Sequence, residues 1–249
     1  MGAKMRSILT IVGLLAAGRL QAAEIYTTSG FESYTNGTVA NKVVGGITWI
    51  EWDTPASVNN ANPLLTQVQT NIFHDGAKAL AIGDITNRVL ARAVRAVTNA
   101  VTYWDAYYKS EATNSFGYAI ITFRTLSFNK SFRLDGSNAW WESSLTNGAA
   151  VTYSNAVSRG KYAPTVLGRW DRVTVGFDRI AGTYAFYLNG TLAFKGNIGF
   201  AATQISSWEI DVTANVASRS PQGQYAFYVD DLAVLTKNPF RKLKLISIR

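Results

Sequence analysis

The sequence RWDRVTVGFDRIAGTYAFYLNGTLAFKG, residues 169–196, decides the fold class of this chain. Within it, apolar and polar residues alternate in three short runs, at residues 172–178, 183–188 and 191–195. Alternation with a period of two is typical of a strand that buries one face. The stretch therefore predicts three consecutive strands.

Two turns separate these three runs. Ala181-Gly182 interrupts the alternation after the first run, and Asn189-Gly190 stands between the second and the third. Asn and Gly both tolerate the positive φ that a two-residue type I′ hairpin requires. The three strands are therefore expected to be antiparallel neighbours.

The rest of the body continues this pattern. Short alternating segments are separated by clusters of Gly, Asn, Ser and Asp, which favours a sandwich over βαβ units. We predict an all-β fold, an antiparallel two-sheet β-sandwich of the jelly roll type. Further strands are expected at residues 43–50, 77–82, 89–97, 101–109, 118–125, 131–134, 149–153, 205–212 and 225–235. Residues 88–100 have helix-forming composition, but their flanks favour a strand. Residues 52–71 are expected to form a long surface loop.

The N-terminus has the pattern of a signal peptide at residues 1–23. Lys4 and Arg6 precede a mostly apolar run at residues 8–18. Two candidate cleavage sites follow, each with a small residue at its last position, Ala22 or Ala23. An uncleaved anchor is the alternative, although the run is about half of the ~20 residues that a span needs. We therefore expect a secreted protein, extracellular or periplasmic, with no stable membrane span.

Composition excludes several classes of site. The 249 residues include no cysteine, so thiol nucleophiles, cysteine-bound zinc and iron–sulfur clusters are absent. The net charge of +8 falls to +5 without the signal peptide and to +1 without Arg241, Lys242, Lys244 and Arg249. A nearly neutral body predicts no nucleic-acid partner. We expect one domain at residues 24–236 and a basic tail at 237–249, as an edge strand, an envelope contact or a disordered end.

Five motifs in order resemble the concanavalin A-like lectin/glucanase superfamily, in its laminin G-like (LamG-like) and carbohydrate-binding-module-like jelly rolls. They cover nearly the whole mature chain and are GFESY at 30–34, DGAKAL at 75–80, YWDAYY at 103–108, the stretch at 169–190, and YAFYVDDLAV at 225–234. The resemblance implies the fold, whereas the same fold carries lectins, hydrolases, lyases and inert spacers.

The resemblance also implies a structural calcium ion. In related jelly rolls an early Glu and a late Asp meet beside the first and last strands, and Glu32 and Asp230 occupy these positions. Asp231 and the carbonyls near Lys78 are further candidate ligands, because calcium takes six to eight oxygens. Two solvated carboxylates at strand ends are the alternative.

Aromatic residues are the candidates for a ligand site. Trp140 and Trp141 are neighbours, so in a strand they face opposite sides, and one of them is expected to be exposed to a sugar. Burial in the sandwich core is the alternative.

A complete catalytic set is not apparent in the sequence. Glu209 and Asp211 resemble a glucanase signature, but the third carboxylate that this motif needs is replaced by Thr213 or Ala214. The single histidine, His74, lies in an expected loop.

The sequence therefore predicts a non-catalytic, carbohydrate-binding module whose partner is a polysaccharide or surface glycan. A polysaccharide hydrolase or lyase with an unfamiliar site is one alternative. A concave groove lined by paired carboxylates, or by Tyr, Arg and His74 together, would favour it. A structural or adhesion component of the envelope is the other. Oligomeric state cannot be deduced.

Overall fold

The computed structural model describes most of the body of the chain. The described residues are 24–39, 42–44, 47–53, 67–82, 89–94, 96–111, 117–124, 129–134, 138–144, 162–197, 204–214 and 227–240. The predicted signal peptide, the predicted strand at 149–153 and the tail beyond residue 240 lie outside them.

The stretch that decides the fold forms three antiparallel strands, as predicted. These are β13 (Trp170–Asp178), β14 (Thr183–Leu188) and β15 (Thr191–Asn197). Both residues of the second turn have positive φ, 50° at Asn189 and 82° at Gly190, as a type I′ turn requires.

These strands belong to sheet A, which is antiparallel throughout its described pairs. Its order is β15-β14-β13-β8-β17-β6-β5-β2, and β1 pairs with the end of β17. The remaining bounds are β1 (Glu24–Thr27), β2 (Gly37–Thr38), β5 (Gln67–Gln69), β6 (Ala79–Ile82), β8 (Val101–Ser110) and β17 (Phe227–Leu235).

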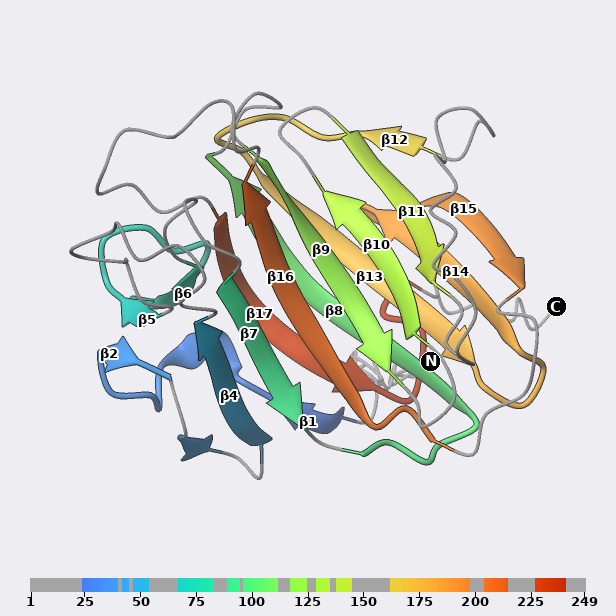
Figure 1. Ribbon diagram of the computed structural model, residues 1–249, viewed down its shortest axis with the longest axis horizontal. Helices are drawn as coiled ribbons and strands as arrows, with labels where there is room; N and C mark the ends of the chain where they lie inside the picture. The colour runs from blue at the N-terminus through green and yellow to red at the C-terminus, as the bar shows by residue number, and fades with distance from the viewer. Residues whose placement is uncertain are drawn as a thin grey trace, which may run out of the picture.

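Sheet B is also antiparallel and has the order β12-β11-β10-β9-β16-β7-β4-β3. Its strands are β3 (Val43–Val44), β4 (Ile47–Asp53), β7 (Val89–Val94), β9 (Gly117–Arg124), β10 (Asn129–Leu134), β11 (Asn138–Ser144), β12 (Tyr162–Pro164) and β16 (Ser207–Ala214). Figure 1 shows the two sheets stacked face to face.

Aromatic rings fill the space between the sheets. Phe123 of sheet B packs against Trp104 and Phe177 of sheet A, with ring centroids 4.9 and 4.8 Å apart. Phe132 packs against Phe186 at 5.3 Å. All five rings are nearly inaccessible to solvent. This core confirms the all-β sandwich. It is formed by the inner faces of the two sheets, and the outer faces do not contribute to it.

Several elements differ from the sequence-based expectation. Residues 89–94 form a strand, as preferred, but the expected loop at 52–71 contains β5, whose Val68 is buried. Five strands were not expected, namely β1, β2, β5, β11 and β12. Among the described residues, no helix has the length and apolar character to cross a membrane.

Candidate functional site

The three predicted calcium ligands come together where the two ends of the domain meet. Glu32 follows the short turn η1 (Ser29–Phe31), and Asp230 and Asp231 lie in β17. A Cβ placed on Gly30 would lie 3.2 Å from Asp231 Oδ1 and 3.5 Å from Asp230 Oδ1, and 3.9 Å from Glu32 Cγ. The three side chains therefore surround Gly30, and we call them the chain-end cluster.

A β-bulge positions the two aspartates. Asp230 pairs with Tyr107, and Ala233 pairs with Asp105. Between these two pairs β17 contains one residue more than β8. Asp231 has φ 49°, a conformation uncommon for residues other than Gly. The bulge redirects consecutive side chains, which is why both carboxylates reach the same region.

Asp230 is a carboxylate with no solvent-accessible surface. Its Oδ2 accepts the backbone N–H groups of His74 at 2.8 Å and Asp75 at 3.3 Å, and its Oδ1 accepts that of Asp231 at 2.8 Å. Burial raises the pKa of Asp230 to about 6, although these amide hydrogen bonds oppose the shift. The carboxylate therefore fastens the β5–β6 loop to β17.

Glu32 fastens the same loop to the N-terminal part of the chain. Its Oε1 accepts the backbone N–H groups of Ala77 at 2.7 Å and Lys78 at 3.0 Å. The Lys78 ammonium in turn donates to the carbonyl oxygens of Glu32 and Tyr34, at 3.0 and 2.8 Å.

The donor chemistry of the chain-end cluster suits calcium, because all of its side-chain ligands are oxygens. Within the described part of the chain, however, no three histidine or acidic side chains are spaced as a set of metal ligands. The cluster therefore has the right atoms for calcium without a preset geometry.

A group of rings lies beside this cluster on the outer face of sheet A. His74 stacks on Tyr107 with centroids 3.5 Å apart, and its Nδ1 lies 3.3 Å from Asp231 Oδ2. Trp170 contacts the edge of His74 at 5.9 Å. Arg172 lies on the same face, 5.8 Å from the Tyr107 ring. The fold thus gathers His74, a tyrosine and an arginine.

The arginine of this group is already paired. Arg172 Nε donates to both oxygens of Asp105, at 3.0 and 3.1 Å, and Nη2 donates to Oδ2 at 2.5 Å. Thr174 Oγ1 donates to Asp105 Oδ1 at 2.5 Å. The ring of Phe240 covers the guanidinium at 4.5 Å. The pair therefore holds the sheet face and the segment after β17 together.

An open groove of about 660 Å³ lies further along the outer face of sheet A. It crosses β8, β13, β14 and β15 along two rows of paired residues. The rows are Tyr103–Gly176–Ala185–Lys195 and Val101–Asp178–Thr183–Asn197, and the backbone between them completes the lining. The groove is hollow because Gly176 and Ala185 occupy the middle of the first row.

Tyr103 is held over the floor of this groove. A Cβ at Gly176 would lie 2.6 Å from Tyr103 Cε1 and 2.9 Å from Cδ1. Only glycine therefore permits the ring to lie so close to the sheet. A glycine inside a strand of bulky residues is the signal that could have indicated this site, because such a glycine often marks a close approach.

The structure describes the strand that carries the predicted aromatic site, but not the side chains of that site. Trp140 and Trp141 occupy β11, where their backbones pair with Arg133 and Phe132. The side chains of both tryptophans, like those of Glu209 and Asp211, lie outside the described part of the structure.

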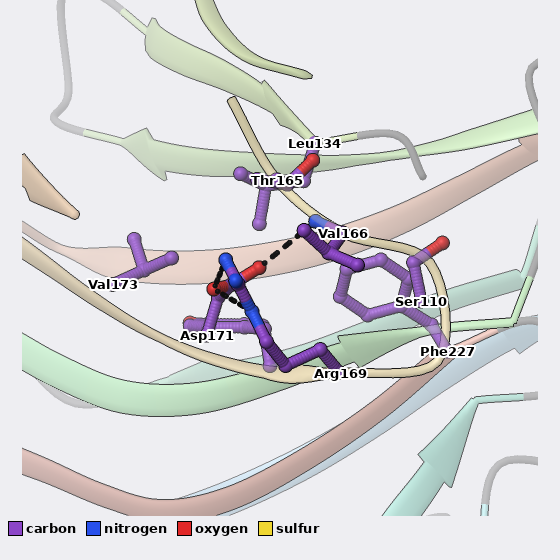
Figure 2. Close-up of a pocket in the computed structure, with 9 residues that line it drawn as sticks. Ser110, Leu134, Thr165, Val166, Arg169, Asp171, Val173 and Phe227 are labelled. Atoms are coloured by element: carbon purple, nitrogen blue, oxygen red, sulfur yellow. Dashed lines mark hydrogen bonds and ion pairs between the residues drawn. The ribbon is translucent and has the colours of Figure 1, made fainter. Parts of the chain in front are cut away.

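A second hollow lies between the sheets and is too small for a sugar. Its volume is about 10 Å³, room for about one water molecule. Figure 2 shows Arg169 and the Val166 backbone directed at Asp171, and the Arg169 Nε–Asp171 Oδ1 distance is 2.9 Å. This hollow is part of the packing below the 165–169 loop.

No protein-family model matches this sequence, and no curated protein matches it either. Solved structures do resemble the fold. The receptor binding domain of botulinum neurotoxin D is 14% identical with a TM-score of 0.50, over 86% of this chain and 49% of that one. The serotype D ligand binding domain in complex with N-acetylneuraminic acid is 13% identical with a TM-score of 0.50, over 86% and 47%.

An endo-β-1,4-glucuronan lyase from the fungus Trichoderma reesei is 12% identical with a TM-score of 0.49, over 75% of this chain and 90% of that one. This chain spans about half the length of the toxin domains it matches. At these identities the toxin domains show a shared β-sandwich fold and nothing further.

Proposed function

We propose that this protein is a secreted, non-catalytic module that binds a glycan in the groove on the outer face of sheet A. The observation that carries the proposal is the ring of Tyr103, held against Gly176 inside a hollow bordered by polar side chains. Sugars present apolar C–H faces that pack on aromatic rings, and their hydroxyl groups need polar partners nearby.

The size and lining of the groove agree with this use. Small-molecule sites are commonly 300–1,000 Å³ and combine apolar surface with a few polar groups. The groove, at about 660 Å³, lies in this range and offers Thr183, Lys195 and Asn197 as hydrogen-bonding side chains. A toxin domain of similar fold in complex with N-acetylneuraminic acid supports a sugar site on such a sandwich.

The test is a glycan array followed by calorimetry of the best ligand with single variants. We expect Tyr103→Ala to weaken binding by tenfold or more, as for a central aromatic contact. Ala185→Leu should weaken binding comparably, because the added side chain fills the hollow while Tyr103 is kept. Trp170→Ala, an aromatic change on the same sheet face outside the groove, should leave affinity unchanged.

Two outcomes would contradict this assignment. Full affinity in both Tyr103→Ala and Ala185→Leu would exclude the groove as the site, and loss of binding in Trp170→Ala alone would move the site to the rings around His74. No binding to any glycan would favour a structural or adhesion role.

A polysaccharide-degrading enzyme is the second candidate, because the fold brings His74, Tyr107 and Arg172 together. Two features favour binding over catalysis. Arg172 is committed to Asp105, and the groove lining contains a single carboxylate, Asp178, and no histidine. If the mature protein degraded any polymer, and His74→Ala abolished this activity, an enzyme would become the preferred function.

We also propose a structural calcium ion at the chain-end cluster. Asp230 is a buried carboxylate that no lysine or arginine contacts among the described residues, and Glu32 and Asp231 lie beside the same Gly30. A divalent cation would compensate this charge. Secretion is proposed from the N-terminal sequence pattern.

A further inference from the structure

The groove lining carries one ammonium group, on Lys195, and one carboxylate, on Asp178, and only the carboxylate is engaged by its own fold. Lys195 is exposed, and its ammonium makes no hydrogen bond or ion pair with another described residue. Asp178 is the one carboxylate in the lining, and it stabilises the turn after β13. Its Oδ1 accepts the backbone N–H groups of Ile180 at 3.1 Å and Ala181 at 2.8 Å. The Lys195 ammonium is therefore the charge available to a ligand.

The register places this ammonium opposite the aromatic ring. Lys195 pairs with Ala185, and Ala185 pairs with Gly176, over which Tyr103 lies. Neighbouring strands are about 4.8 Å apart, so roughly 10 Å separates the strand that bears Lys195 from the one that the ring covers. One sugar ring fits over this interval, with room for a charged substituent directed toward Lys195.

We infer that the groove binds an acidic glycan, one whose sugar ring carries a carboxylate. The inference rests on the proposed function and adds the class of ligand. The sugar ring packs on Tyr103, the carboxylate pairs with the Lys195 ammonium, and Thr183 and Asn197 in the adjacent row are within the same groove for hydroxyl groups. Charge-assisted hydrogen bonds favour a carboxylate over the neutral alcohol at this position.

The test compares a uronic-acid oligosaccharide with the same oligosaccharide after reduction of its carboxyl groups, by calorimetry on the full chain. We expect the uronate to bind about twofold to fivefold more tightly, since an exposed ion pair contributes modestly, and the preference to shrink at high salt. Lys195→Gln should abolish the preference and Lys195→Arg should keep it. Lys42→Gln, a change before β3 in sheet B, should leave it intact.

The outcomes separate this inference from the proposal beneath it. Equal affinity for the two oligosaccharides, with binding still lost in Tyr103→Ala, would overturn the acidic-glycan inference and leave the groove as a glycan site. A preference that survives Lys195→Gln would also overturn it. Equally tight binding of an O-sulfated neutral oligosaccharide would show that any anion suffices, which would contradict the inference of a carboxylate. Binding that is absent, or that is unaffected by both Tyr103→Ala and Ala185→Leu, would overturn the proposed function itself.

Discussion

Asp230 shows how one residue can work against the fold at neutral pH. The folded state raises its pKa from 3.8 to about 6, chiefly through burial. A raised carboxyl pKa means that the folded protein holds the proton more tightly than the unfolded chain. The associated stability is fully present below pH ~4 and is lost as pH rises through about 6.

We therefore predict that Asp230→Asn reduces the dependence of stability on pH. In the wild type with chelator present, the free energy of unfolding should gain on the order of 3 kcal/mol from this group as pH falls from 7.5 to 4. The variant should lack this gain. Denaturant unfolding at several pH values measures the two slopes. Parallel slopes would show that Asp230 does not titrate in this range.

Asp178→Asn, at the end of β13 on the outer face of the same sheet, is the matched control and should keep the wild-type slope. It removes a carboxylate of the same kind without touching the chain-end cluster.

The residues of the site differ in how visible they are in the sequence. Glu32, Asp230 and Asp231 could be predicted to lie together, because they stand in recognisable motifs at the two ends of the domain. Tyr103 and Lys195 could not, because nothing local marks them. They share a groove only through the register of four strands. That register depends on the pairing of β8 with β13, in which Val101 and Asp178, 77 positions apart, are partners.

At the scale of elements, the turn between β14 and β15 has two separable requirements. Gly190 has φ 82°, and a Cβ there would lie 3.2 Å from Phe240 Cδ1. Phe240 packs on this turn, on Arg172 and on Tyr187, and Asn238 Nδ2 donates to the Tyr187 hydroxyl at 3.2 Å. The segment after β17 is thereby attached to the outer face of sheet A.

We predict that Gly190→Ala destabilises the protein by about 1–2 kcal/mol, from the positive φ together with crowding of Phe240. Gly37→Ala is the control for backbone conformation alone. Gly37 has φ 106°, and nothing lies within 4 Å of its added Cβ. Denaturant unfolding gives both values. In a Phe240→Ala background, the excess cost of Gly190→Ala over Gly37→Ala should disappear, and its persistence would contradict the contact.

Elements were predictable where the information is local. The hairpin at β14–β15 has alternation on both sides of an Asn-Gly turn, so its position was correct to within a few residues. β5 is three residues long, QVQ, and β11 reads NAWWESS without clear alternation. These two strands form because they hydrogen-bond to neighbouring strands. A local stretch of sequence does not reveal those long-range pairings, so it could not predict the two strands.

At the scale of the whole molecule, the chain-end cluster connects residues about 200 positions apart. An ion held by Glu32 and Asp230 would bind the folded state and not the unfolded chain, and would stabilise it by mass action. We predict that the melting temperature of the full-length protein in millimolar calcium exceeds that in chelator by roughly 5–10 °C, the shift expected for about 3 kcal/mol in a chain of this size.

Differential scanning calorimetry measures both midpoints. Asp230→Asn should remove the difference between them, and Asp178→Asn should keep it. Identical wild-type midpoints, with no calcium found by elemental analysis, would exclude the ion. The amide hydrogen bonds to Glu32 and Asp230 and the pairing of β1 with β17 would then connect the two ends of the domain without an ion.

The position of β17 has a consequence for how the protein is made. This strand lies between β8 and β6 in sheet A, and β1 pairs with its last residues. β17 follows every other described strand along the chain, so β8 and β6 are both made before the strand that joins them. Sheet A can therefore close only after residues 227–235 have been made. Until then its larger strands stand in two separate groups, β15-β14-β13-β8 and β6-β5-β2, each with an unpaired edge at the position that β17 will occupy.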